Sequence, residues 1–157
     1  MLIEFALVLP VMLLLAAGVY VFGSLLRANA ALNRLVMQYA ISFADCSDTS
    51  SGVCGTELAE YETTAALNNI APQLSPSSLT LTMAQAIMSG TTPTVEYPVG
   101  GSLTAAQISA LQAVVPSGQT GVVVTASYLF TPVIFAPLIQ PFIGTGVTLS
   151  YTMAQLK

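Results

Sequence analysis

The sequence contains no histidine, and few of its 157 residues are charged: three are basic and seven are acidic. The absence of histidine excludes histidine-based acid–base catalysis and histidine metal ligation. Three basic residues are also too few for the basic patch that binds nucleic-acid phosphates, so nucleic acid is not an expected partner. Because ordinary globular domains carry about 25% charged residues, we expect much of this surface to face a partner or a membrane.

The combinations of side chains that enzymes use are also scarce. An enzyme needs a nucleophile with a base, paired carboxylates or a metal. The only lysine is Lys157, Glu96 is isolated in the sequence, and Asp45 and Asp48 are typical of turn residues. The sequence therefore predicts no enzymatic activity, no cofactor and no metal site.

Hydrophobic residues make up 54% of the chain, and the longest apolar run lies near the N-terminus. Residues 5–26 read FALVLPVMLLLAAGVYVFGSLL and contain no charge. As a helix they span about 33 Å, which is enough to cross a bilayer core. A cleaved signal peptide would have a basic start and a shorter apolar stretch, whereas this chain begins Met-Leu-Ile-Glu. A single-pass membrane anchor remains open on composition alone.

The helical pattern continues beyond the apolar run. Five apolar residues recur at spacings of three and four and predict one face of an amphipathic helix: Ala28, Leu32, Leu35, Tyr39 and Phe43. We expect one continuous helix of about 40 residues, because no turn cluster interrupts residues 11–44. Pro10 lies in its apolar half and should kink or locally open it. Gly18 and Gly23 leave small surfaces where another helix could approach closely.

Two cysteines, Cys46 and Cys54, flank a loop rich in Ser, Thr, Asp and Gly directly after this helix. A local disulfide is the simplest interpretation, and it would stabilise the fold by about 2.5 kcal/mol in the chain-entropy model. The alternative is a pair of free thiols or half of a metal site, but two thiolates without histidine cannot complete a zinc site.

The middle of the chain predicts short helices and strands. We expect a helix over 57–70, where three glutamates at the start favour either a capped helix terminus or a cation site. A strand is expected over 78–84, and a turn-rich stretch over 89–101 contains a short strand around Val95–Tyr97. A short helix is expected over 105–115, because Pro116 would stop it.

The last third has the clearest β pattern. Residues 121–130 and 146–154 alternate apolar with small or hydroxyl side chains, which predicts two long antiparallel strands. Their tyrosines, Tyr128 and Tyr151, fit either core packing or exposed adhesion contacts. The segment between these strands contains three prolines, which forbid a central strand or a helix. Because it is nonetheless very apolar, we predict a subunit contact through Phe135, Leu138, Ile139 and Phe142.

The N-terminal octapeptide Ile3-Glu4-Phe5-Ala6-Leu7-Val8-Leu9-Pro10 resembles the VEFALVLP opening of TadE-like proteins. These are pseudopilins of the tight-adherence (Tad) branch of the type IV pilin superfamily. The two C-terminal strands with a proline-rich apolar loop between them are also similar to that family. The resemblance implies an α+β, type IV pilin-like fold, with a membrane and filament-core helix over 1–44. An extracytoplasmic globular domain with short helices and an antiparallel sheet would cover 45–157.

The resemblance also implies a function, that of a pilin or pseudopilin in an extracellular filament on the bacterial surface. The helix would hold the subunit in the inner membrane until prepilin peptidase and the assembly machinery add it to other copies or to sister pilins. Eight apolar side chains would pack in the filament core: Leu7, Leu9, Leu13, Leu14, Val19, Val21, Phe22 and Leu25. The alternative is an anchored extracytoplasmic domain that binds a ligand and does not polymerise.

The resemblance assigns a role to Glu4, which precedes Phe5 at the edge of the apolar run. A carboxylate beside an apolar environment is costly unless it is paired, and in the family it pairs with the free α-amino group of a neighbouring subunit. A glutamate at the headgroup level that merely ends the anchor is the alternative. The family's glutamate is usually fifth in the mature chain and here it is fourth, so we expect this chain to be a processed form.

Overall fold

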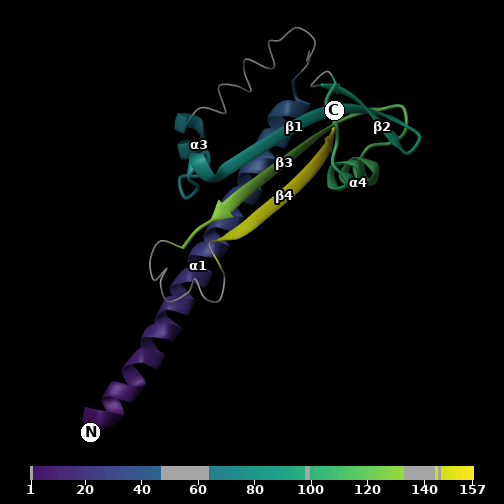
Figure 1. Cartoon of the computed structure of the whole chain (residues 1–157). Coiled ribbons are helices and arrows are strands. Elements are labelled where there is room, and N and C mark those ends of the chain that lie inside the picture. The colour runs from purple at the N-terminus through teal and green to yellow at the C-terminus, as the bar shows by residue number, and fades with distance from the viewer. Residues whose placement is uncertain (1, 47–63, 98–99, 133–143, 145) are drawn as a thin grey trace.

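A computed structural model describes the chain except for residues 1, 47–63, 98–99, 133–143 and 145, and it describes only the backbone of residues 2–7 and 64–66. A long helix, α1 (Leu2–Ala44), leads into a small domain built on one sheet (Figure 1). Four antiparallel strands form this sheet in the order β2-β1-β3-β4. The α+β class predicted from the sequence is confirmed.

The expected long helix is present as α1, which has 43 residues. It continues without interruption through Pro10, so the local opening expected there stays a prediction for the assembled state. The five residues of the predicted apolar face are all buried, with at most 3% of each exposed. They pack on β3 (Thr120–Phe130) and β4 (Val147–Leu156). The second half of α1 is therefore part of the core of the globular domain.

Strand β3 lies in the centre of the sheet and uses both of its faces. Its even-numbered residues Val122, Val124 and Ala126 pack in the core beneath α1, whereas Val123 packs in a second core on the opposite face. Both strands predicted for the last third are confirmed, and they pair antiparallel from Gly121 opposite Leu156 to Phe130 opposite Val147.

The predictions for β1 and β2 were partly wrong. Strand β1 spans Leu79–Ser89, five residues beyond the expected end, and β2 spans Thr92–Tyr97. The two form a hairpin in which Ser89 pairs with Thr92, and Gly90 in its two-residue loop has a φ of 64°, which glycine adopts without steric cost. The pairing with β2 shifts register between Gln85 and Ala86, where β2 has an extra residue, whereas β1 pairs with β3 without a break. The apolar residues of the second half of β1 lie on the other face of the sheet, where Ala84, Ala86 and Met88 pack in the second core.

The described residues contain two further α-helices. Helix α3 (Thr64–Ile70) is the described part of the helix expected over 57–70, and a short 3₁₀ turn, η1 (Pro76–Ser78), leads from it towards β1. Helix α4 (Ala105–Val114) confirms the helix expected before Pro116. A capping box begins α4: the Gln107 N–H donates to Thr104 Oγ1 at 3.3 Å, and the Thr104 N–H donates to Gln107 Oε1 at 2.9 Å.

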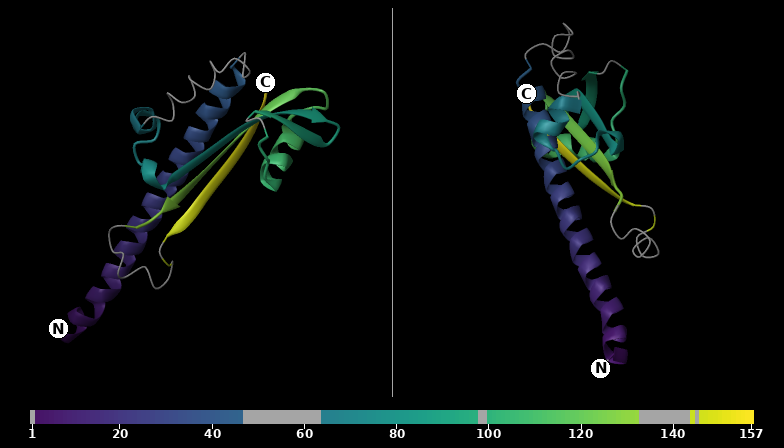
Figure 2. Two further views of the ribbon diagram at one scale, coloured as in Figure 1. Left: turned by 45° about the horizontal axis from the view of Figure 1, so that its top comes forward. Right: turned by 90° about the vertical axis from the view of Figure 1, so that its left-hand side faces the viewer.

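Helix α4 packs on the face of the sheet opposite α1 (Figure 2). Leu111 and Val115 are buried there against Val123. The Gln107 side-chain amide donates to the hydroxyls of Thr82 and Thr125 at 3.4 and 3.2 Å. These contacts cover only one end of that face. The same end carries β2 and the C-terminal end of β4.

Candidate functional site: the exposed face of the long helix

The N-terminal half of α1 extends away from the globular domain (Figures 1 and 2). Ten large apolar side chains on it are between 46% and 76% exposed: Val8, Leu9, Val11, Met12, Leu13, Leu14, Leu15, Val19, Tyr20 and Phe22. The mean hydropathy of the most apolar 18-residue window is 2.2, and 6% of that window is buried. This part of α1 is long and apolar enough to cross a membrane.

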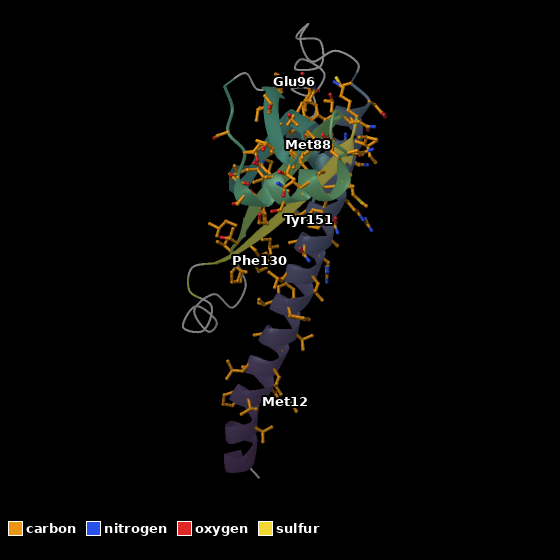
Figure 3. The ribbon with its side chains drawn as sticks, turned by 90° about the vertical axis from the view of Figure 1, so that its right-hand side faces the viewer. Met12, Met88, Glu96, Phe130 and Tyr151 are labelled. Atoms are coloured by element: carbon orange, nitrogen blue, oxygen red, sulfur yellow. The ribbon has the colours of Figure 1, made fainter. Side chains whose placement is uncertain are left out.

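One line of exposed apolar residues follows α1 from Val8 to Ala30 and resumes at Met37 and Ile41, with the polar Asn33 between the two parts. We call it the outer stripe, and its members recur at helical spacing: Val8, Met12, Leu15, Val19, Phe22, Leu26, Ala30, Met37 and Ile41. At 100° per residue these positions fall within a sector of about 100°, roughly opposite the buried face that carries Leu32 and Tyr39. Met12 is among the side chains that project from the bare part of the helix in Figure 3.

The outer stripe continues past the length that a bilayer covers. Leu26 is 52% exposed, Met37 is 47% exposed and Ile41 is 48% exposed. Val8 and Ile41 are separated by about 50 Å along the helix axis, whereas the hydrocarbon core of a bilayer is about 30 Å thick. The last residues of the stripe thus lie beside the globular domain, on the side of α1 that faces away from the sheet.

The predicted filament-core residues fall into three groups. Leu9, Leu13, Leu14, Val19 and Phe22 are exposed on α1. Val21 and Leu25 are half-buried instead, because they pack against the core of the globular domain. The backbones of Glu4, Phe5 and Leu7 are helical, but their side chains are outside the described part of the chain.

The structure describes only some of the remaining predicted site residues. Cys46 is buried, but Cys54 lies outside the described residues, so the disulfide stays a prediction. The predicted subunit-contact loop with Phe135, Leu138, Ile139 and Phe142 also lies outside them. Tyr128 is 8% exposed and Tyr151 packs against the same core, which favours core packing over adhesion for both.

Two positions on α1 leave room for another helix. A Cβ atom added at Gly18 or Gly23 would meet no heavy atom within 4 Å. Neither glycine is therefore needed for packing within the chain, and both leave the backbone accessible to close approach. Leu26, Met37 and Ile41 were not predicted as site residues, although their spacing, and the position of Met37 and Ile41 opposite the predicted apolar face, was a signal.

The chemistry of the described residues is that of a contact surface. Among the described side chains, no group of three His, Cys, Asp or Glu residues comes together. Arg27 and Arg34 are exposed on α1, and Glu96 lies on β2 at the far end of the sheet from the bare helix (Figure 3), where it accepts a hydrogen bond from Gln85 Nε2 at 2.8 Å.

A family model described as TadE-like protein matches residues 1–40. No curated protein and no solved structure matches the chain. The match covers the bare apolar half of α1 and most of the half that packs on the sheet. Over residues 1–40 the chain is therefore similar to TadE-like proteins.

Proposed function

We propose that the chain is a structural subunit of a Tad-type pilus. Helix α1 holds it in the inner membrane before assembly, and the same helix then packs against α1 of other copies or of sister pilins in an extracellular filament. The family match at residues 1–40 and the exposed apolar helix fit a membrane-anchored, pilus-associated protein. Polymerisation does not follow from these two observations alone.

The outer stripe supports polymerisation. Met37 and Ile41 lie about 16 and 22 Å beyond Leu26 along the helix axis, and each is nearly half exposed. A bilayer that covers the bare half of α1 does not reach them. Exposed apolar surface of this kind marks a protein contact, and a second α1 that follows the same stripe would cover both the membrane half and the domain half.

The alternative function, a single-pass anchor with a ligand-binding domain, gives no reason for the second half of the stripe. An anchor needs apolar residues only over the thickness of the hydrocarbon core. Beyond it, the face of α1 opposite the sheet would face water, where polar side chains such as those of Arg27 and Arg34 are expected. Met37 and Ile41 on the same stretch favour a subunit over a plain anchor.

Two finer features belong to the same proposal. Glu4 would pair with the α-amino group of a neighbouring subunit as the helices pack, which compensates the cost of a carboxylate at the edge of a dry environment. The Cys46–Cys54 disulfide would close the loop after α1 in an oxidising compartment outside the cytoplasm. Prepilin peptidase and the pilus assembly machinery are the partners that this function requires.

Filaments sheared from the cell surface test the proposal. The chain should be recovered in the sheared fraction, and electron microscopy should show that cells without it lose or change their filaments. Retention of the chain in the membrane fraction, together with unchanged filaments in cells that lack it, would refute the subunit function and favour the anchored domain.

A further inference from the structure

In the part of the chain that the structure describes, no strand pairs with the outer edge of β4, and this edge lacks the features that usually block strand pairing. No residue from Val147 to Leu156 is charged or a proline, and such residues are the common protection of edge strands. The Lys157 N–H donates to the Thr120 carbonyl at 3.0 Å, which sets the alternation of the ladder. The backbone groups of Ser150 and Thr152 therefore point away from β3, out of the sheet.

Within the described residues, part of β1 also has an unpaired edge, in the same rows of the sheet as Ser150 and Thr152 of β4. Strand β2 pairs with β1 only from Gln85 to Ser89, so within the described residues no strand lies beside Leu79–Ala84 on that side. The Met88 N–H donates to the Gln119 carbonyl at 3.0 Å, and by alternation the backbone groups of Leu79 and Leu81 point outward. A groove of about 340 Å³ runs beside this edge, lined by Tyr39, Leu67, Pro76, Leu79, Thr80 and Leu81.

The two edges carry the same side-chain pattern. On the face beneath α1, Leu81 and Tyr151 flank Ala126 in one row of the sheet, and both edge residues are only half-buried, whereas Ala126 is fully buried. On the opposite face, Thr80 and Ser150 flank Ser127. If the two edges joined between copies, apolar side chains would meet on one face and hydroxyl side chains on the other.

The direction of α1 selects among the possible pairings. Strands β1 and β4 both run in the same general direction as α1 (Figures 1 and 2). Antiparallel pairing of β4 with β4 of another copy would point the two α1 helices in opposite directions, which one membrane does not permit. Parallel pairing of β4 with β1 of another copy keeps the helices parallel. It is also heterologous, and heterologous contacts that do not close into a ring generate open helical arrays.

The other described edge is a poorer partner. Strand β2 contains Pro93, which has no N–H to donate, and the exposed Glu96, and both discourage strand pairing. We propose that β4 of one copy pairs in parallel with the Leu79–Met83 edge of β1 in a second copy, beside the groove. This inference rests on the proposed function and names the lateral contact between globular domains that would accompany the packing of the helices.

Site-specific photocrosslinking tests the contact directly. The full chain, with a benzophenone amino acid in place of the exposed Thr148 on β4, is mixed with a ¹⁵N-labelled full chain in detergent and irradiated. Mass spectrometry should find adducts between chains that map to residues 76–83. Adducts between chains that map elsewhere, or adducts only within one chain, would overturn the pairing. If sedimentation shows no association at all, both this inference and the proposed function fail.

Lysine substitutions at the two edges provide a second test. S150K and T80K each place a charge on the outer face of one edge, and each should abolish the adduct while leaving association through α1 in place. Mixing the S150K chain with a T80E chain should restore the adduct, because opposite charges then lie in the same row of the joined sheets. S109K, on the exposed face of α4, is the matched control and should keep the adduct. An adduct that survives S150K and T80K would overturn the inference.

Discussion

Replacing the two stripe residues beside the globular domain should weaken self-association without loosening the membrane anchor. The change is Met37→Gln together with Ile41→Gln. Glutamine is as good a helix former as most residues, and substitutions at exposed positions usually change folding stability by less than about 0.5 kcal/mol. The fold and the insertion of the first half of α1 should therefore remain as they are.

The size of the effect follows from the exposure of the two side chains. Burial of a whole Met or Ile side chain contributes about 1.5–3 kcal/mol, and 47% of Met37 and 48% of Ile41 remain to be buried. The two together contribute about 2 kcal/mol to each contact between subunits. Because every 1.4 kcal/mol is a factor of ten, the dissociation constant should rise about 30-fold.

Sedimentation equilibrium of the full chain in detergent measures this constant, and carbonate extraction of membranes confirms that insertion is unchanged. Val114→Gln is the matched control, because Val114 is 49% exposed on α4, away from the stripe. An unchanged dissociation constant in the double variant, or an equal rise in the control, would refute the assignment of the outer stripe as the subunit contact.

Three further predictions concern other parts of the chain. Glu4→Ala should sharply reduce the yield of filaments while the protein still inserts into membranes, and a normal yield would contradict the pairing with the α-amino group. The intact mass should rise by about two hydrogens on reduction, as the Cys46–Cys54 disulfide requires, and no change would mean free thiols. Gly121→Ala should lower the free energy of unfolding by about 1–3 kcal/mol, because the added Cβ would overlap the buried side chain of Val115; Gly23→Ala, which meets open space, should not.

Periodic sequence features predicted the corresponding parts of the fold well. The five residues predicted for the apolar face between Ala28 and Phe43 are all buried, because a 3.6-residue period places them on one side of a helix. Ala31, Val36 and Ala40, which were not predicted, are buried beside them. Strands β3 and β4 were predicted from a different period, the alternation of apolar with small or hydroxyl side chains, which continues over about ten residues in each. The end of helix α4 followed from Pro116, which stops a helix.

The sequence was a poorer guide where the pattern depends on tertiary pairing. Strand β1 was expected to end at Ala84, because the apolar residues of its second half lie on the opposite face, where Ala84, Ala86 and Met88 pack in the second core. Met37 and Ile41 lie opposite the predicted apolar face of α1, so their spacing was a sequence signal of exposure. Val21 and Leu25 were assigned to the filament core because the first half of α1 is apolar all round and does not show which face the domain contacts, whereas they pack against the domain.

The most direct test of the account is whether α1 of one copy contacts α1 of another in the filament. A benzophenone amino acid in place of Val19, the most exposed large side chain of the stripe at 76%, reports its neighbour on irradiation of sheared filaments. The account predicts adducts with the stretch from Leu15 to Leu26 of a second copy or with the corresponding helix of a sister pilin. Adducts with lipid alone would contradict it.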